Sequence, residues 1–251
     1  MATAVRTIDE RQGRLHVTGD INPKANGGVA EIVTSMWSKA KDVADALGIG
    51  SKAADLLGKC APESVTPWTT HFKKSMGGAR GALAFFYWPI TLRNAWKSQS
   101  VRDWVEVTKI GGFTAAAAVP FAATSEKILN WTGIPGIVLD CFDLSREVEL
   151  NKACTDLTGQ PVSAEARKII NHQMWTSTCK ILKLCLTLFA GITVTGAWLF
   201  GCALPVALAT AALVASLGGL VLGFTISYAD TNAEWTAKVK LTPEPKSATT
   251  V

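Results

Sequence analysis

The sequence predicts an all-α membrane protein that is anchored by a hairpin of two transmembrane helices. Three observations predict this fold class. Only 18% of the 251 residues are charged, where an average soluble domain has about 25%, and the mean hydropathy is +0.22. Residues 184–229 are 46 consecutive positions without a charged residue. The segments that precede this run repeat apolar residues at helical spacing.

The N-terminal part of the chain is polar. Residues 1–28 contain the turn-forming pairs Asn22-Pro23 and Gly27-Gly28, so we expect this segment to be disordered. It lacks the apolar core of a secretory signal peptide, and we expect none. Residues 29–183 are predicted to form a helical region, in which residues 31–47 and 164–182 each place their apolar side chains on one face and are expected to be amphipathic helices.

Three shorter apolar stretches lie within this helical region, at residues 81–92, 111–125 and 128–139. None reaches the roughly 20 residues that a helix needs to cross the hydrocarbon core. Stretches of this length form buried core helices, re-entrant pieces or interfacial helices. The aromatic residues at 85–88 would suit a headgroup interface. The sequence leaves open whether any of the three stretches enters a membrane.

The uncharged run at 184–229 divides into two spans. Gly201 and Pro205 mark the break, because proline interrupts a helix and glycine favours a turn. A single helix over the whole run would be about 69 Å long, more than twice the hydrocarbon thickness of a bilayer. We therefore predict a bilobed transmembrane hairpin, with spans at residues 184–201 and 206–228.

Small residues recur at every fourth position of the second span, as Ala211, Ala215, Gly219 and Gly223. Such a row allows two helices to approach closely in lipid. It predicts packing within the hairpin more than dimerisation, and a homo-oligomer stays open. The alternative is a soluble bundle that buries an apolar hairpin, as in a helical effector or toxin that inserts conditionally.

The charges beside the run predict its orientation. Arg167, Lys168, Lys180 and Lys183 precede it, against the single acid Glu165 in residues 160–183. Positive residues near a span stay on the cytoplasmic side. Because two spans return the chain to the side from which it started, both flanks are predicted to be cytosolic.

The C-terminal tail, residues 230–251, is predicted to be disordered, because its last part has two prolines and few large apolar residues. It ends in Thr249, Thr250 and Val251. This pattern matches the Ser/Thr-x-apolar carboxyl terminus that PDZ domains bind by strand addition. The pattern is common by chance, so a solvated tail is the simpler expectation.

Sequence motifs of catalysis and metal binding are missing. There is no P-loop, dinucleotide-binding glycine pattern, nucleophile elbow or H-E-x-x-H. The six cysteines include no C-x-x-C pair, and the net charge of +5 is scattered rather than gathered into a stripe for nucleic acid. No Asp, Glu, Lys, Arg or His lies in the apolar run, which argues against a transporter. We expect a protein that is not an enzyme and has no cofactor, metal or nucleic-acid partner.

This organisation, with one bilobed apolar domain split by a short turn, resembles the chlamydial inclusion membrane proteins. The resemblance is architectural and rests on residues 184–228 with their break at Gly201 and Pro205. It implies type III secretion through an uncleaved N-terminal signal and insertion into the inclusion membrane. Both termini would then face the host cytosol and recruit host proteins. The sequence departs from the family pattern in its additional apolar stretches in the middle region, because the family has only two spans.

Three functions follow from these features. The first is a membrane-anchored interaction protein, whose partners are membrane lipid and other proteins. The second is a membrane-shaping hairpin protein, and the third is the soluble effector that inserts conditionally. A hairpin protein of an organelle or of a bacterial inner membrane is the other interpretation of the localisation.

Overall fold

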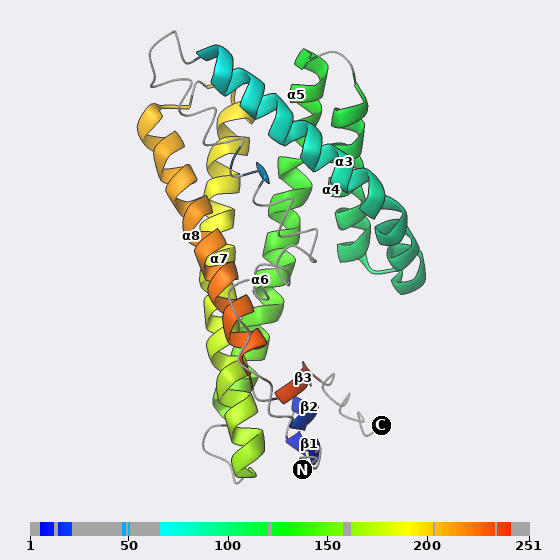
Figure 1. The fold of residues 1–251 in the computed structure, drawn as a ribbon, viewed down its shortest axis with the longest axis vertical. Coiled ribbons are helices and arrows are strands. Elements are labelled where there is room, and N and C mark those ends of the chain that lie inside the picture. The colour runs from blue at the N-terminus through cyan, green and yellow to red at the C-terminus, as the bar shows by residue number, and fades with distance from the viewer. Residues whose placement is uncertain are drawn as a thin grey trace, which may run out of the picture.

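The structure, a computed structural model, describes residues 6–12, 15–21, 47–48, 50, 66–119, 122–157, 162–202, 204–233 and 235–241. Helices dominate these residues (Figure 1), so the predicted helical fold class is confirmed. The named helices are α3 (Thr66–Ser98), α4 (Val101–Ala118), α5 (Ala122–Trp131), α6 (Gly133–Asp156), α7 (Ala164–Leu199) and α8 (Val206–Thr231).

The helices form a bundle in which chain neighbours pack against one another. The main contacts join α3 to α4, α6 to α7, and α7 to α8, while α4 also contacts α5 and α6. In Figure 1, α6, α7 and α8 lie side by side along the longest axis of the molecule, with α3, α4 and α5 beside α6. The result is a three-helix column with a second helical group attached to α6.

One continuous helix replaces two predicted segments. The amphipathic helix expected at 164–182 and the span expected from 184 are both part of α7, so the domain boundary placed between 183 and 184 falls inside a helix. Ser163 caps its start, since its Oγ accepts a hydrogen bond from the Ala166 N–H at 3.1 Å. The change from amphipathic to wholly apolar composition near residue 183 therefore does not end the helix.

The two ends of the chain meet in a small antiparallel sheet. Its strands are β1 (Arg6–Gln12), β2 (Leu15–Ile21) and β3 (Trp235–Leu241), in the order β1-β2-β3. The disorder predicted for 1–28 and 230–251 is therefore wrong for these strands. β3 follows β2 by more than 200 residues, so no local pattern in the sequence indicates that the two strands pair.

The sheet is attached to the bundle through the central strand. Leu15 and Val17 of β2 are almost fully buried and join a core with Leu150 and Cys154 of α6 and Ile169 of α7. His16 and Thr18, which alternate with them on the strand, are less buried, because alternate side chains of a strand point to opposite faces. This core fixes the sheet where α6 ends and α7 begins (Figure 1).

Candidate functional site

The turn between α7 and α8 is built by the two residues that the sequence singled out. Gly201 has a φ of +63°, a left-handed conformation that glycine adopts without strain and that ends α7. The next N–H, that of Cys202, donates to the carbonyl of Ala197 at 2.9 Å. Pro205 is the N-cap of α8, and its carbonyl accepts a hydrogen bond from the Ala209 N–H at 2.9 Å. The hairpin thus reverses direction where Gly201 and Pro205 predicted it.

Small residues form the interface between α7 and α8. Ala212 and Ala215 are buried in a cluster with Ala190 of α7. A Cβ at Gly219 would lie 3.4 Å from Thr187 Cγ2, so the helices are in van der Waals contact there. A Cβ at Gly218 would lie 3.2 Å from Leu186 Cδ1. These contacts place the backbones close together, as small residues allow.

The predicted row lies only partly at the centre of this interface. Ala215 and Gly219 are buried, whereas Ala211 and Gly223 are half-buried. Positions spaced strictly by four drift around a helix of 3.6 residues per turn. The buried face therefore also takes in other positions, namely Ala212, Ser216, Ile226 and Ser227.

The outer face of the hairpin is apolar and exposed. α7 and α8 are the two described helices that are long and apolar enough to cross a membrane. In their most apolar 18-residue stretches, only 17% of α7 and 22% of α8 is buried. Val221, for example, is 64% exposed. A hairpin at the core of a soluble protein would instead be mostly buried, so this exposure is the main property of the site.

Charged side chains collect at the base of the hairpin, away from its turn. Lys180 Nζ lies 3.5 Å from Glu147 Oε1 of α6, and Ser177 Oγ donates to Glu147 Oε2 at 2.9 Å. Lys183 packs against α8, where a Cβ at Gly223 would lie 3.2 Å from its Nζ. A lysine at this position can keep its ammonium group in the headgroup region while its stem lies against apolar surface.

A second pair joins the two helices of the hairpin further from the turn. His172 Nε2 of α7 lies 3.0 Å from Asp230 Oδ1 of α8. Asp230 is also the first charged residue after the apolar run. The pair therefore joins α7 to the last turn of α8, about three helical turns further from the hairpin turn than Lys183.

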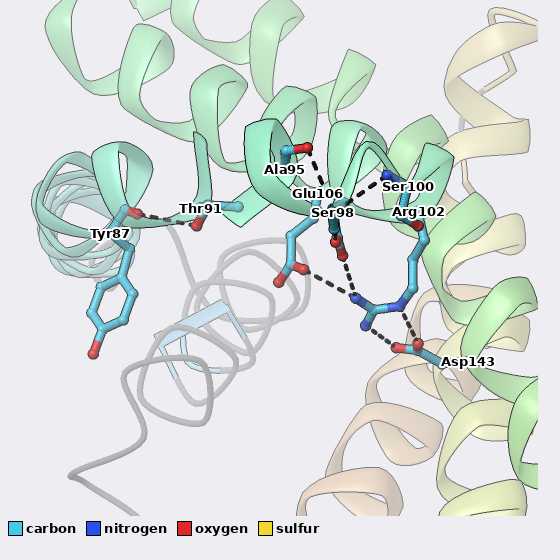
Figure 2. A network of polar contacts seen from close by, with 9 residues as sticks. Tyr87, Thr91, Ala95, Ser98, Ser100, Arg102, Glu106 and Asp143 are labelled. Carbon is cyan, nitrogen blue, oxygen red and sulfur yellow. Dashed lines mark hydrogen bonds and ion pairs between the residues drawn. The ribbon is translucent and has the colours of Figure 1, made fainter. Parts of the chain in front are cut away.

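Arg102 makes a second charged centre, between α4 and α6 (Figure 2). Its Nε donates to Asp143 Oδ1 at 2.7 Å and its Nη2 to Asp143 Oδ2 at 3.1 Å, which is a bidentate contact. Its Nη1 lies 3.3 Å from both Glu106 Oε2 and Asp103 Oδ1. The hydrogen bond to Asp143, together with the surrounding carboxylates, raises the pKa of Arg102. The guanidinium therefore stays charged and ties α4 to α6.

The sequence gives no sign of this centre, because Arg102 and Asp143 are 41 positions apart and no local motif links them. Two serines make polar contacts next to it. Ser98 Oγ donates to Asp103 Oδ2, and the Ser100 N–H donates to Ser98 Oγ at 3.2 Å (Figure 2). These contacts fix the short connection between α3 and α4.

The aromatic stretch at residues 85–88, which would suit a headgroup interface, lies on α3 beside α4. A Cβ at Gly81 would lie 2.1 Å from Ala117 Cβ, and a Cβ at Gly111 would lie 2.8 Å from Trp88 Nε1. Glycine is therefore required for these close approaches. Phe85 and Phe86 are largely exposed. The uncharged stretch of α3 thus runs alongside the uncharged end of α4.

The thiols form no disulfide among the described residues. Five are free, and Cys154 is the buried one, at the core under the sheet. Burial, with a smaller contribution from the charge of Glu147, raises the pKa of Cys154 to about 11. In the part of the chain that the structure describes, no three His, Cys, Asp or Glu side chains gather as metal ligands would.

The predicted PDZ-type tail, with Thr249 and Val251, lies outside the described residues, as does most of the amphipathic helix expected at 31–47. Comparison of the chain with models of protein families, with curated proteins and with solved structures finds no match.

Proposed function

We propose that this chain is an integral membrane protein without enzymatic activity that is anchored by the α7–α8 hairpin and binds other proteins through its cytosolic part. The observation that carries this proposal is the exposed apolar outer face of the hairpin. An exposed apolar surface of this extent needs lipid or protein to cover it. Lipid is favoured because the apolar surface follows both helices from the charged base to the turn.

The lengths of the two helices support a full crossing. The 26 residues of α8 give about 39 Å of helix, more than the hydrocarbon core of roughly 30 Å. Residues 184–199 of α7 give about 24 Å, and the turn residues and the long Lys183 side chain extend that reach. The strands β2 and β3 pair with each other on the side of the base.

The cytosolic part would then consist of the sheet and the ends of α6 and α7 that hold it. We propose this part as the protein-binding surface, because the sequence carries no catalytic motif and the sheet offers two outer strands, β1 and β3. A strand at the edge of a sheet can accept a further strand from a partner. Insertion in an inclusion membrane after type III secretion is the finer form of the proposal, and the bilobed organisation is its support.

The experiment is carbonate extraction of membranes that contain the full chain or one of two variants. Val221→Asp places a carboxylate on the exposed face of α8, and Val148→Asp places one on the charged part of α6, where Val148 is 47% exposed. In water both changes are tolerated. In lipid a central carboxylate costs about 2.5–3.5 kcal/mol, so we expect Val221→Asp to be extracted and the other two proteins to stay in the pellet. Extraction of the unaltered chain would contradict the proposal.

A further inference from the structure

We propose that a second apolar hairpin lies in the lipid beside α7. It consists of residues 110–119 and 122–139, namely the end of α4, all of α5 and the start of α6. We call it the 110–139 hairpin. The inference rests on the proposed function, because it takes the α7–α8 hairpin as inserted. Within these residues the only charges are Glu126 and Lys127, near the tip.

The 110–139 hairpin contacts α7 at the level of its predicted span. A Cβ at Gly191 of α7 would lie 3.3 Å from Ile137 Cγ1, and a Cβ at Gly133 would lie 2.2 Å from Thr195 Oγ1. Residues 191 and 195 both belong to the apolar run. The two helices therefore lie side by side within it.

The contacts continue toward the turn of the α7–α8 hairpin. The rings of Trp131 and Trp198 meet edge to face with centroids 5.1 Å apart. Lys127 precedes Trp131 by about one helical turn and is exposed. The tip of the 110–139 hairpin thus reaches the same end of α7 as Gly201.

The end of α4, which is the first helix of the 110–139 hairpin, packs against the other two. A Cβ at Gly112 of α4 would lie 2.3 Å from Thr132 Cγ2, so α4 and the α5–α6 junction approach each other closely. Ser125 Oγ of α5 donates to the Ala116 carbonyl of α4 at 2.7 Å. Both arms therefore extend from the charged base to the tip as one unit.

Charges bound this unit at its base. The Arg102–Asp143 contact joins α4 and α6 just below it. Lys109 and Asp140 are the first charged residues at its two ends, and each has an interaction within the structure. Lys109 lies against Gly136, where a Cβ would be 3.7 Å from its Cε. The side chain of Lys109 therefore packs on α6 about one helical turn from Asp140, near the base of the unit.

The 110–139 hairpin is shorter than a full span. Residues 128–139 give about 18 Å of helix, against a core of roughly 30 Å. A bilayer accommodates a short segment by local thinning and by the reach of flanking charged side chains. The packing against α7 and the exposed outer face of α6, where Val138 is 36% exposed, fit that arrangement with lipid as the cover.

The test is spin labelling of the full chain in phosphatidylcholine vesicles. Single cysteines replace Ala115, Val138, Val148 or Val221 in a protein whose six cysteines are exchanged for Ala or Ser, and each carries a nitroxide. Collisions with oxygen, which concentrates in lipid, and with a water-soluble nickel chelate are measured. We expect the labels at 115, 138 and 221 to collide often with oxygen and rarely with the nickel chelate. We expect the label at 148 to collide often with the nickel chelate.

The outcomes separate this inference from the proposed function. If 221 is in lipid while 115 and 138 meet nickel, the α7–α8 hairpin is inserted and the 110–139 hairpin is not, which overturns the inference alone. If 115 and 138 meet neither agent, protein covers them, as in a dimer of this chain, and the assignment to lipid is wrong. If 221 meets nickel as 148 does, the proposed function fails as well.

Discussion

At the scale of single residues, Arg102 and Asp143 connect two parts of the bundle that the chain separates widely. The pair is partly buried and bidentate, and such a contact contributes more than an exposed ion pair. Glu106 contacts the same guanidinium from one turn along α4, at 3.3 Å. Neutralising Asp143 or Glu106 in turn therefore compares a contact between helices with a contact within one helix, both on the same arginine.

Asp143→Asn should lower the free energy of unfolding by about 1–2 kcal/mol, because it removes one charge from a hydrogen-bonded pair between helices. Glu106→Gln, within one helix, should cost no more than about 0.5 kcal/mol. Thermal unfolding in detergent micelles measures both. Equal losses in the two variants would mean that Asp143 does not hold α4 on α6.

Cys154 allows a prediction about pH. Its pKa of about 11 lies above the ordinary value of 9.0, because burial disfavours the thiolate. The stabilisation from the buried thiol is thus complete below pH 9.0 and is lost as the pH rises through about 11. Cys154→Ala should lose less stability than the unaltered chain as the pH rises across that window. If both proteins lost the same stability as the pH rises, the loss would come from groups other than Cys154.

At the scale of elements, the sequence predicts α8 and its turn well, since uncharged residues bounded by Pro205 and Asp230 leave little choice of limits. It predicts α7 only in part, because Lys183 looks like a boundary although the helix continues through it. The small-residue row lies on α8, where Ala215 and Gly219 are buried and Ala211 and Gly223 are half-buried. Strand pairing across the whole chain, as between Leu15 and Leu241, leaves no local signal.

Close helix contacts in the bundle depend on particular glycines. Gly133→Ala should destabilise the packing of α6 on α7 by about 1–3 kcal/mol, because its methyl group would overlap Thr195 Oγ1. Gly196→Ala is the control on α7, since nothing lies within 4 Å of its added Cβ. Higher helix propensity should make that change neutral or stabilising by up to about 1 kcal/mol. Thermal unfolding in micelles distinguishes the two, and a loss of similar size in both would contradict the close contact between Gly133 and Thr195.

At the scale of the whole molecule, the sheet supports the predicted topology, in which both flanks of the α7–α8 hairpin lie on one side of the membrane. This support is independent of the flanking charges. β2 near the N-terminus pairs with β3 near the C-terminus over seven positions, from Leu15↔Leu241 to Ile21↔Trp235. Strands that share backbone hydrogen bonds must lie on one side of a membrane. The number of crossings between them is therefore even, whether the α7–α8 hairpin crosses alone or together with the 110–139 hairpin.

The central claim is that the turn of the α7–α8 hairpin reaches the side of the membrane opposite the termini, and Cys202, an exposed thiol in that turn, reports it directly. The measurement is labelling of a protein that keeps only Cys202 with a membrane-impermeant maleimide, in sealed vesicles whose C-terminal tag is open to added protease. Val148→Cys in the same background is the control on the side of the base. We expect the control to be labelled in intact vesicles and Cys202 only after the membrane is permeabilised. Labelling of Cys202 in intact vesicles at the rate of the control would contradict the account.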